Sequence, residues 1–265
     1  MSDRYAVVGN PVAHSRSPWI HAEFARATGQ DLEYGRIEAP LDAFERTVEE
    51  FRAAGGKGLN VTLPFKEAAF HYCKSVSERA ATAQAVNTLR FNDEVFGDNT
   101  DGVGLVSDLQ HNLGFSLGGK SILLMGAGGA AQGVVQALLD ASVARLVIAN
   151  RTVPRAEALA ARFGVSASSY AALSGQGFDL VINATSAGLS NAAPALPASV
   201  FKRGSLAYDM MYGRDTPFLA QARAAGARAC DGLGMLVEQA AESFLLWRGV
   251  RPGTRSVLER LRAAA

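Results

Sequence analysis

The 265-residue sequence contains only two cysteines, Cys73 and Cys230, and four histidines. Two cysteines so far apart in the chain do not suggest a disulfide framework. The histidines are scattered, without the short spacings that are typical of metal ligands. We therefore expect a metal-free protein from a reducing compartment.

Neither sign of charge is in excess, because the chain has 26 basic and 25 acidic residues, and both kinds are spread along it. This excludes a basic stripe for nucleic acid and a basic cluster beside a membrane. The uncharged stretch Ser121–Leu139 is as long as a membrane span, but glycines and glutamines interrupt it. The first residues, Met1–Tyr5, show no apolar signal segment. We expect a soluble, cytoplasmic protein, either a monomer or a homodimer, that binds neither nucleic acid nor a membrane.

Hydrophobic residues make up 48% of the chain, enough for a substantial core in one large domain or two smaller ones. Apolar runs of strand length alternate with helical segments, a pattern typical of α/β proteins. The predicted strands are Tyr5–Gly9, Leu32–Ile37, Gly58–Val61, Asn87–Phe91, Val95–Gly97, Ser121–Met125, Leu146–Ala149, Leu180–Asn183 and Ser205–Asp209. The predicted helices are Pro18–Thr28, Leu41–Ala54, Phe65–Tyr72, Asp101–Asn112, Ala130–Ala141, Val153–Arg162, Pro217–Ala225, Met235–Trp247 and Ser256–Ala264.

A glycine-rich turn joins a predicted strand to a predicted helix in the middle of the chain. Its residues, Gly126, Ala127, Gly128, Gly129, Ala130 and Ala131, fit the pattern G-x-G-x-x-G/A. Such a turn lets a pyrophosphate approach the backbone and accept hydrogen bonds at the N-terminus of the helix. The alternative is a tight turn that binds no ligand. The buried strand before it and the helix after it favour a dinucleotide site.

Arg151 follows the next predicted strand, Leu146–Ala149, where the residue type distinguishes the two nicotinamide dinucleotides. An acidic residue would accept hydrogen bonds from a free ribose 2′-hydroxyl, whereas an arginine can neutralise a 2′-phosphate. Arg155, one helical turn further on, is a second candidate cation. The sequence predicts NADP(H) as the cofactor; a solvated Arg151 is the alternative.

Residues 1–120 precede the glycine turn, although a simple dinucleotide-binding domain usually begins with it. We therefore predict two domains. Residues 1–101 form an α/β substrate domain, and residues 102–237 form a Rossmann-type domain. The last helices have no strand to follow, so we expect residues 238–265 to pack back on the first domain.

Small polar residues and one lysine gather at strand ends and loops before residue 102, where α/β proteins bind ligands. They are Ser15, Ser17, Asn60, Thr62, Lys66, Asn87, Thr88, Asn99, Thr100 and Asp101. Such a lining suits a small polyhydroxylated acid, and a lysine paired with an aspartate can protonate the alkoxide formed by hydride transfer to a ketone. Ser17 and Asp101 have an alternative role as helix N-caps. The sequence does not show whether Lys66 and Asp101 meet.

These motifs resemble the shikimate dehydrogenase family over nearly the whole chain. The segments that carry the resemblance are Gly9–Pro18, Asn60–Lys66, Ala85–Thr88, Asp98–Gly102, Gly126–Ala131, Asn150–Thr152, Asn183–Gly188, Tyr208–Tyr212 and Asp231–Gln239. The resemblance implies reversible reduction of 3-dehydroshikimate to shikimate by NADPH, in the biosynthesis of chorismate and the aromatic amino acids. It implies that Lys66 and Asp101 are the catalytic pair.

The resemblance also implies the residues that bind the two ligands. Ser15 and Ser17 would hold the substrate carboxylate, and the pocket would be completed by Asn60, Thr62, Asn87, Tyr212 and Gln239. On the cofactor side, the resemblance implies the loop from Gly126 to Ala131 together with Asn150, Arg151, Thr152, Arg155, Thr185, Met210 and Gly232. Spacing alone would have identified neither Gln239 nor Met210.

Two other functions stay open from the sequence. The first is a dehydrogenase that acts on quinate, or on both substrates, with relaxed cofactor choice; the two serines and Arg151 favour shikimate and NADP. The second is a non-catalytic ligand sensor on the same fold. Lys66 and Asp101 are both present and no DNA-binding segment is evident, which argues against it.

Overall fold

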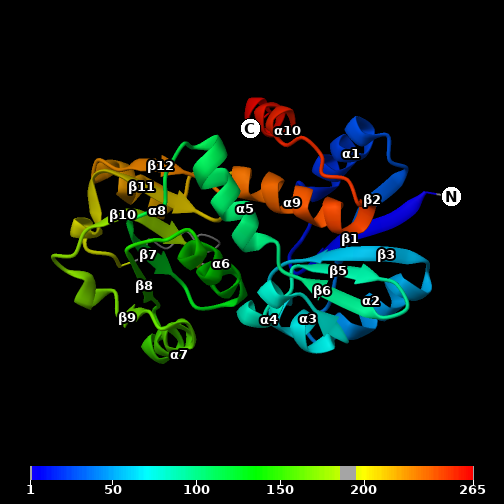
Figure 1. The fold of residues 1–265 in the computed structure, drawn as a ribbon, viewed down its shortest axis with the longest axis horizontal. Coiled ribbons are helices and arrows are strands. Elements are labelled where there is room, and N and C mark those ends of the chain that lie inside the picture. The colour runs from blue at the N-terminus through cyan, green and yellow to red at the C-terminus, as the bar shows by residue number, and fades with distance from the viewer. Residues whose placement is uncertain (1, 186–194, 265) are drawn as a thin grey trace. The chain divides into compact units, whose positions relative to one another are not determined.

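A computed structural model of the chain describes residues 2–185 and 195–264. The chain divides into two compact units, which are described separately below. Unit 1 comprises residues 1–105 and 236–265, and unit 2 comprises residues 106–235 (Figure 1). The motif predicted at Asn183–Gly188 lies outside the described residues from position 186 onward. Within the described part of the chain, no helix is long and apolar enough to cross a membrane.

Unit 1 contains a mixed sheet of six strands among the described residues, in the order β2-β1-β3-β5-β6-β4. Strands β2, β1 and β3 are parallel, β5 and β6 form an antiparallel hairpin beside β3, and β4 runs parallel to β6. The strands are β1 (Asp3–Gly9), β2 (Leu32–Glu38), β3 (Gly56–Val61), β4 (Ser75–Val76), β5 (Thr88–Phe91) and β6 (Val95–Asp98). The helices are α1 (Ser17–Thr28), α2 (Phe44–Ala53), α3 (Lys66–Tyr72), α4 (Glu78–Ala83), α5 (Asp101–Ser107), α9 (Leu233–Arg248) and α10 (Arg255–Ala263).

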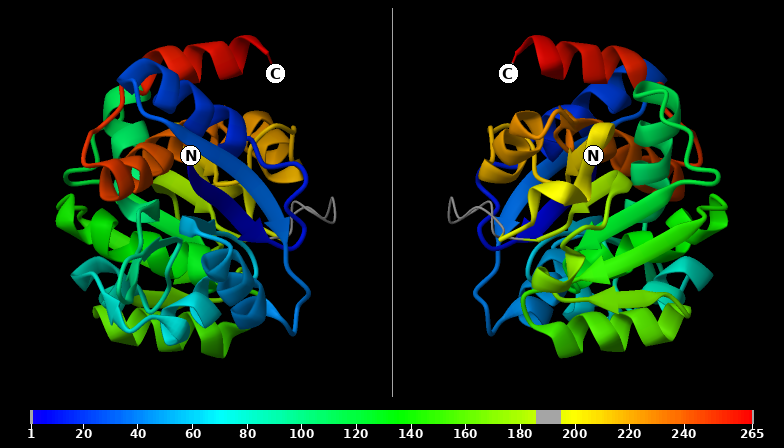
Figure 2. Two further views of the ribbon diagram at one scale, coloured as in Figure 1. Left: turned by 90° about the vertical axis from the view of Figure 1, so that its right-hand side faces the viewer. Right: turned by 90° about the vertical axis from the view of Figure 1, so that its left-hand side faces the viewer.

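Helices cover both faces of this sheet, because alternate residues of its central strands are apolar on both sides. Ala6 and Val8 of β1 face the core formed with α2, α3 and α4. Tyr5, on the other face of β1, stacks on Trp247 of α9 with ring centroids 4.6 Å apart. Figure 2 shows α1 and α2 on opposite sides of the blue strands. The C-terminal residues from 236 onward, which include most of α9 and all of α10, belong to unit 1.

Unit 2 contains a parallel sheet in the order β12-β11-β10-β7-β8-β9. Numbered within the unit from the other edge, this order is 3-2-1-4-5-6, which is the Rossmann arrangement. The strands are β7 (Ser121–Met125), β8 (Arg145–Ala149), β9 (Ser166–Ser168), β10 (Phe178–Asn183), β11 (Phe201–Asp209) and β12 (Arg228–Cys230). The helices are α6 (Gly129–Asp140), α7 (Val153–Phe163) and α8 (Pro217–Ala224), with a π-helical segment at Asp108–Asn112 and short 3-10 segments at Ala171–Leu173 and Ala198–Val200.

The predicted elements are present in the structure, with ends that move by up to four residues. The predicted helix Asp101–Asn112 is divided into α5 and the π-helical segment. Four short elements were not predicted: β4, α4, β9 and β12. They are too short to show a periodicity. Helix α4 nevertheless has a local sequence signal, which is Ser77, since serine is favoured at helix N-caps. In the structure the Ser77 hydroxyl accepts a hydrogen bond from the Ala80 amide at 3.2 Å.

A cluster of aromatic rings fixes α1 and α9 on one face of the unit 1 sheet. The imidazole of His21 is fully buried and stacks on Tyr34 with ring centroids 4.2 Å apart and an interplanar angle of 4°. Phe24 and Phe244 pack around it. Burial lowers the pKa of His21 from 6.5 to about 3, so the ring stays neutral in the folded protein.

This neutral histidine should make the stability of unit 1 depend on pH. Between pH 6.5 and pH 3 the unfolded chain binds a proton at His21 and the folded chain does not, so the free energy of unfolding falls as the pH falls. We expect the wild-type protein to lose about 2 kcal/mol more than His21→Phe between pH 7.5 and pH 5.0, from 1.36 kcal/mol per pH unit below 6.5. Urea unfolding at both pH values measures this, and equal losses in the two proteins would contradict it.

Candidate functional site

Lys66 and Asp101 meet in unit 1. Lys66 is the first residue of α3 and Asp101 the first residue of α5. The Lys66 Nζ donates a hydrogen bond to Asp101 Oδ2, and only 14% and 6% of the two side chains are exposed. A charge so far removed from water must be paired, because desolvation of a lone ion is costly. The structure thus brings together the two residues whose contact the sequence left undecided.

Asn87 holds the other oxygen of this carboxylate. Its Nδ2 donates to Asp101 Oδ1 at 2.9 Å and also to Thr100 Oγ1, while its Oδ1 accepts from the Thr100 amide at 2.9 Å. This pattern fixes the orientation of the Asn87 amide. The Asn99 side chain accepts from the Asp101 amide at 3.1 Å, so Asn99 supplies the side-chain oxygen at the start of α5. The alternative of Asp101 as the N-cap is therefore wrong, and its carboxylate faces Lys66 and Asn87.

The segment that carries Asp101 is anchored by a second ion pair. Asp98, at the end of β6, accepts two hydrogen bonds from the Arg79 guanidinium of α4 at 2.7 and 2.5 Å and one from the Ser77 hydroxyl. Burial alone would raise the pKa of Asp98, but the hydrogen bonds and the charge of Arg79, together with the bonds from Ser77 and the Asn99 amide, outweigh burial and hold that pKa below its ordinary value. No pattern in the sequence marks Arg79 and Asp98 as partners in this arrangement.

Asn60 is the centre of a buried hydrogen-bond network. Its Oδ1 accepts from the Tyr34 hydroxyl at 2.7 Å, and its Nδ2 donates to Ser243 Oγ at 2.9 Å and to Thr88 Oγ1 at 3.2 Å. Ser243 of α9 also contacts Thr88 Oγ1 at 2.8 Å. Both polar atoms of the Asn60 amide are thus engaged by protein partners, which ties β2, β3, β5 and α9 together at this point.

Gln239 reaches the same network from α9, one turn before Ser243. Its Oε1 accepts from Asn87 Nδ2 at 3.3 Å, and its Nε2 donates to the Leu236 carbonyl at 2.8 Å. The backbone of α5 comes close to it, since a Cβ on Gly104 would lie 2.7 Å from the Gln239 Cβ. Gly104 therefore allows α5 and α9 to approach. Gln239, for which the sequence offered no physical signal, lies beside Asn87.

The two predicted serines lie together in the loop between β1 and α1, and both are buried. The Ser17 amide donates to Ser15 Oγ at 3.3 Å. Arg16 occupies the N-cap position of α1 without a side-chain bond, and Pro18 follows in the first turn. The alternative of Ser17 as the N-cap is therefore wrong. Thr62 follows β3, and its methyl group would lie 2.4 Å from a Cβ on Gly9, so glycine is required at the end of β1.

Asn60 lies near the end of β3, and Thr62 and Lys66 come after that strand. Asn87 directly precedes β5, and Asp101 follows β6 at the start of α5. Tyr212 lies in unit 2, after β11, so the structure does not place it among them. Thr88 and Thr100 are among the polar residues identified from the sequence, whereas Ser243 and Tyr34 were not identified as partners of this network. No local signal distinguishes Ser243, because the same helix also carries the polar residues Glu238 and Glu242.

The predicted cofactor loop of unit 2 has the backbone that close approach of a ligand requires. Gly126 adopts φ 112°, and a Cβ there would lie 2.9 Å from the Ala184 carbonyl oxygen. Ala127 is buried, whereas Gly128, Gly129 and Ala130 are partly exposed at the start of α6. Gly128 is the N-cap of α6 and provides no side-chain bond to its first amides. Those amides can serve an anion.

The remaining predicted cofactor residues lie at the carboxyl ends of the strands of unit 2 and in the loops after them. Arg151, Thr152 and Arg155 are exposed after β8 and on α7, and Asn150 Nδ2 donates to the Thr152 carbonyl at 3.0 Å. Thr185 Oγ1 donates to Asn183 Oδ1 at 2.7 Å, and the Met210 amide donates to the Asn183 carbonyl at 2.9 Å.

Gly232 approaches the backbone of Met210, because a Cβ at Gly232 would lie 2.5 Å from the Met210 carbonyl oxygen. The carboxyl edge of a doubly wound sheet is where such folds bind dinucleotides. A free helix N-terminus, a glycine backbone without Cβ atoms and two exposed arginines form a donor set that fits a phosphorylated dinucleotide. No group of three or more His, Cys, Asp or Glu side chains that could hold a metal ion occurs in the described part of the chain.

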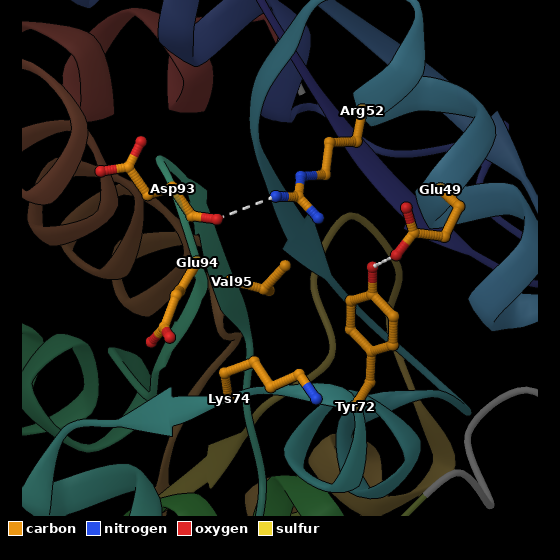
Figure 3. Close-up of a pocket in the computed structure, with 7 residues that line it drawn as sticks. All are labelled: Glu49, Arg52, Tyr72, Lys74, Asp93, Glu94 and Val95. Carbon is orange, nitrogen blue, oxygen red and sulfur yellow. Dashed lines mark hydrogen bonds between the residues drawn. The ribbon is translucent and has the colours of Figure 1, made fainter.

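A pocket elsewhere in unit 1 is separate from this site. It has a volume of about 180 Å³ and lies between α2, α3 and the β5–β6 hairpin, lined by Glu49, Arg52, Tyr72, Lys74, Asp93, Glu94 and Val95 (Figure 3). The Tyr72 hydroxyl donates to Glu49 Oε1, and Arg52 Nη2 donates to the Asp93 carbonyl. None of the residues predicted for substrate or cofactor lines it.

Comparison with known proteins identifies three matching segments. Residues 7–89 match the shikimate dehydrogenase substrate-binding domain, residues 108–193 match the family described as shikimate/quinate 5-dehydrogenase, and residues 232–262 match the shikimate 5′-dehydrogenase C-terminal domain.

Individual proteins match over nearly the whole chain. The shikimate dehydrogenase (NADP(+)) of Dechloromonas aromatica is 59% identical, over 99% of this chain and 98% of its own length. A crystal structure of an Ael1 enzyme from Pseudomonas putida is 51% identical with a TM-score of 0.92, covering 98% of each chain. Shikimate 5-dehydrogenase from Thermus thermophilus, in complex with NADP(H) and shikimate, is 38% identical with a TM-score of 0.89, over 99% of this chain and 100% of its own.

The buried hydroxyl of Ser243 should stabilise unit 1. In Ser243→Ala, Asn60 Nδ2 and Thr88 Oγ1 each lose a partner that they contact at 2.9 and 2.8 Å. We expect the free energy of unfolding to fall by about 1–3 kcal/mol, the cost of leaving buried polar groups poorly satisfied. Urea unfolding measures this, with Ser256→Ala on the exposed side of α10 as the matched control. The same stability in both variants would refute the role of the network.

Proposed function

The chain belongs to the shikimate dehydrogenase family, and we propose that it catalyses the reversible reduction of 3-dehydroshikimate to shikimate with NADPH. The observation that carries this proposal is the buried Lys66–Asp101 pair, set in a lining of hydroxyl and amide groups. Such a lining suits a small polyhydroxylated acid, and the pair can move one proton at a carbonyl oxygen. In the family this step belongs to the biosynthesis of chorismate and the aromatic amino acids, which we propose as the pathway.

Lys66 is the proton donor of the proposed reaction. Asp101 accepts hydrogen bonds on both carboxylate oxygens, from Lys66 and from Asn87, as an ionised carboxylate does. The ammonium group of Lys66 is therefore the member of the pair with a proton to give. Asp101 orients that ammonium group and compensates its charge, and Asn87 holds the Asp101 carboxylate in place.

The residues of unit 2 would hold NADPH, which when bound would supply the hydride for the C3 carbonyl carbon of 3-dehydroshikimate. As negative charge develops on the C3 oxygen, Lys66 Nζ gives that oxygen a proton and becomes a neutral amine, which solvent then reprotonates. The product is shikimate. In the opposite direction the neutral amine of Lys66 accepts the proton from the C3 hydroxyl, so the same residue acts as base.

Ser15 and Ser17 hold the substrate carboxylate in this proposal, and Thr62, Asn87, Tyr212 and Gln239 contact its ring hydroxyls. Asn60 belongs to the same pocket in this proposal, and its hydrogen bonds to Tyr34, Thr88 and Ser243 also fix the strand end from which Thr62 and Lys66 extend. Unit 1 is the substrate domain and unit 2 the NADP domain; the bounds predicted from the sequence, after residues 101 and 237, lie within four residues of the divisions after residues 105 and 235.

In the NADP domain the pyrophosphate binds at Gly126–Ala130 and the 2′-phosphate at Arg151, Thr152 and Arg155, beside Asn150. The nicotinamide end contacts Thr185, Met210 and Gly232. NADP dependence is the property named for the Dechloromonas aromatica relative, and it agrees with an arginine at position 151.

Initial rates with the four combinations of shikimate or quinate with NADP+ or NAD+ test this function. Absorbance of the reduced nicotinamide should rise fastest with shikimate and NADP+. Comparable rates with quinate or NAD+ would favour a quinate/shikimate dehydrogenase of broader range. Calorimetric binding of shikimate without turnover in any combination would favour a non-catalytic sensor.

Lys66→Ala should lower kcat by roughly 100-fold or more while KM for shikimate moves little, because the proton donor is lost and the groups that bind the substrate remain. Steady-state rates with saturating NADP+ measure both constants, and thermal unfolding verifies that the variant is folded. Lys57→Ala, an exposed lysine of β3, is the matched control and should retain the wild-type rates. A wild-type kcat in Lys66→Ala would exclude Lys66 as the acid.

Arg151→Ala should raise KM for NADP+ by about tenfold or more, since it removes a charged partner of the 2′-phosphate. Turnover with NAD+, which lacks that phosphate, should change much less than the KM for NADP+. Arg203→Ala, an exposed arginine of β11, controls for the loss of one positive charge in unit 2. Equal losses with both cofactors would show that Arg151 is structural.

A further inference from the structure

We propose that Arg36 is a specificity-determining residue that supplies the positive charge for the substrate carboxylate and holds Ser15 in position. This inference rests on the proposed function, since it requires that Ser15 and Ser17 receive a carboxylate. Arg36 was not identified from the sequence, where it reads as an ordinary exposed residue of a strand.

The geometry connects Arg36 to the serine loop directly. Its Nε and Nη2 both donate to the Ser15 carbonyl oxygen, at 3.0 and 2.6 Å. Arg36 lies near the carboxyl end of β2, which pairs in parallel with β1, and the serine loop leaves the carboxyl end of β1. The guanidinium group is thus held beside Ser15 by two hydrogen bonds.

Part of this guanidinium group is left for a ligand. Within the described residues Arg36 donates only to the Ser15 carbonyl, so Nη1 has no protein acceptor, and no ion pair neutralises its charge. A guanidinium group can bind a carboxylate through two parallel donors. Arg36 therefore has both the charge and the free donors that a carboxylate requires.

The other groups proposed around the carboxylate do not provide that charge. Ser15 and Ser17 are neutral and buried. Lys66 is the cation predicted from the sequence for the substrate site, and its ammonium group is paired with Asp101. The start of α1 offers few free amides, because the Ser17 amide donates to Ser15 Oγ and Pro18 has no N–H.

A carboxylate held only by two serine hydroxyls in a partly buried loop would keep an uncompensated charge, which is costly. A fixed cation next to Ser15 removes that cost. Arg36 should therefore contribute to the affinity for the substrate anion much more than to the rate of the chemical step, which takes place at the C3 oxygen.

Two arginines serve as comparators. Arg16 lies between the two serines, is exposed, and makes no side-chain hydrogen bond at the N-terminus of α1. Arg46 of α2 is 72% exposed and has Glu50 as its neighbour at 3.8 Å. Replacement of either by glutamine removes the same net charge from unit 1 as Arg36→Gln and leaves the contacts to the Ser15 carbonyl in place.

The experiment measures kcat and KM with saturating NADP+ for shikimate and for its neutral methyl ester. The ester serves as a substrate or, where turnover is slow, as a competitive inhibitor. For Arg36→Gln we expect KM for shikimate to rise about tenfold or more, with kcat within about threefold of the wild-type value. The KM of the ester, or its inhibition constant, should stay within about twofold of the wild-type value. Arg36→Lys should be intermediate, because it retains the charge and loses the paired donors. Arg16→Gln and Arg46→Gln should behave as wild type.

Three results would overturn the inference. Equal weakening of shikimate and ester in Arg36→Gln would mean that Arg36 only shapes the serine loop. A selective loss of shikimate affinity in Arg16→Gln alone would assign the charge to Arg16. A wild-type KM for shikimate in Arg36→Gln would exclude a role for Arg36 in substrate binding. Failure of the proposed function has a different signature, since the wild-type protein itself would then not oxidise shikimate with NADP+.

Discussion

A buried ion pair between Lys66 and Asp101 constrains much of unit 1. Two opposite charges that are mostly withdrawn from water stabilise the fold only if their partners are held in place, and removing one partner leaves a charge that the interior cannot solvate. Asn87 donates a hydrogen bond to the second carboxylate oxygen of Asp101, and the Asn99 side chain accepts one from the Asp101 amide. The Asp98–Arg79 pair anchors the segment just before Asp101. These contacts connect α3, α4, β6 and α5 to one another.

The same packing provides the chemistry that we propose. A proton donor is most effective when its orientation is set before the substrate arrives, because no reorganisation is then needed during the reaction. Helix α9 extends this preorganisation: Gln239 contacts Asn87, and Ser243 contacts Asn60 and Thr88. Arg36 holds the serine loop in a similar way, through two hydrogen bonds to the Ser15 carbonyl oxygen.

Much of this could be predicted from the sequence. Long apolar runs such as Ser121–Met125 and the glycine turn at Gly126 are local signals, since buried parallel strands and positive φ angles restrict the residue types that can occur. The Rossmann order of unit 2 follows from such elements. Short edge strands such as β4 and β12 could not be predicted, because two or three residues show no periodicity.

The candidate site was predicted unevenly, for a physical reason. Lys66 and Asp101 are polar residues at predicted strand and helix ends, and a pattern can mark such positions. Ser243 and Arg36 acquire their significance from partners 183 and 21 residues away, Asn60 and Ser15, and no local pattern indicates those contacts. Ser17 and Asp101 illustrate the opposite error, because local rules offered both as N-caps and the structure uses neither in that way.

The most direct test of the central claim is a crystal structure of the protein in complex with shikimate and NADP+. The account predicts that the C3 oxygen of shikimate lies within hydrogen-bonding distance of Lys66 Nζ, with Asp101 beside it and the carboxylate at Ser15 and Ser17. A shikimate molecule whose C3 oxygen lies away from Lys66, or whose ring is reversed so that the carboxylate faces Asp101, would contradict it.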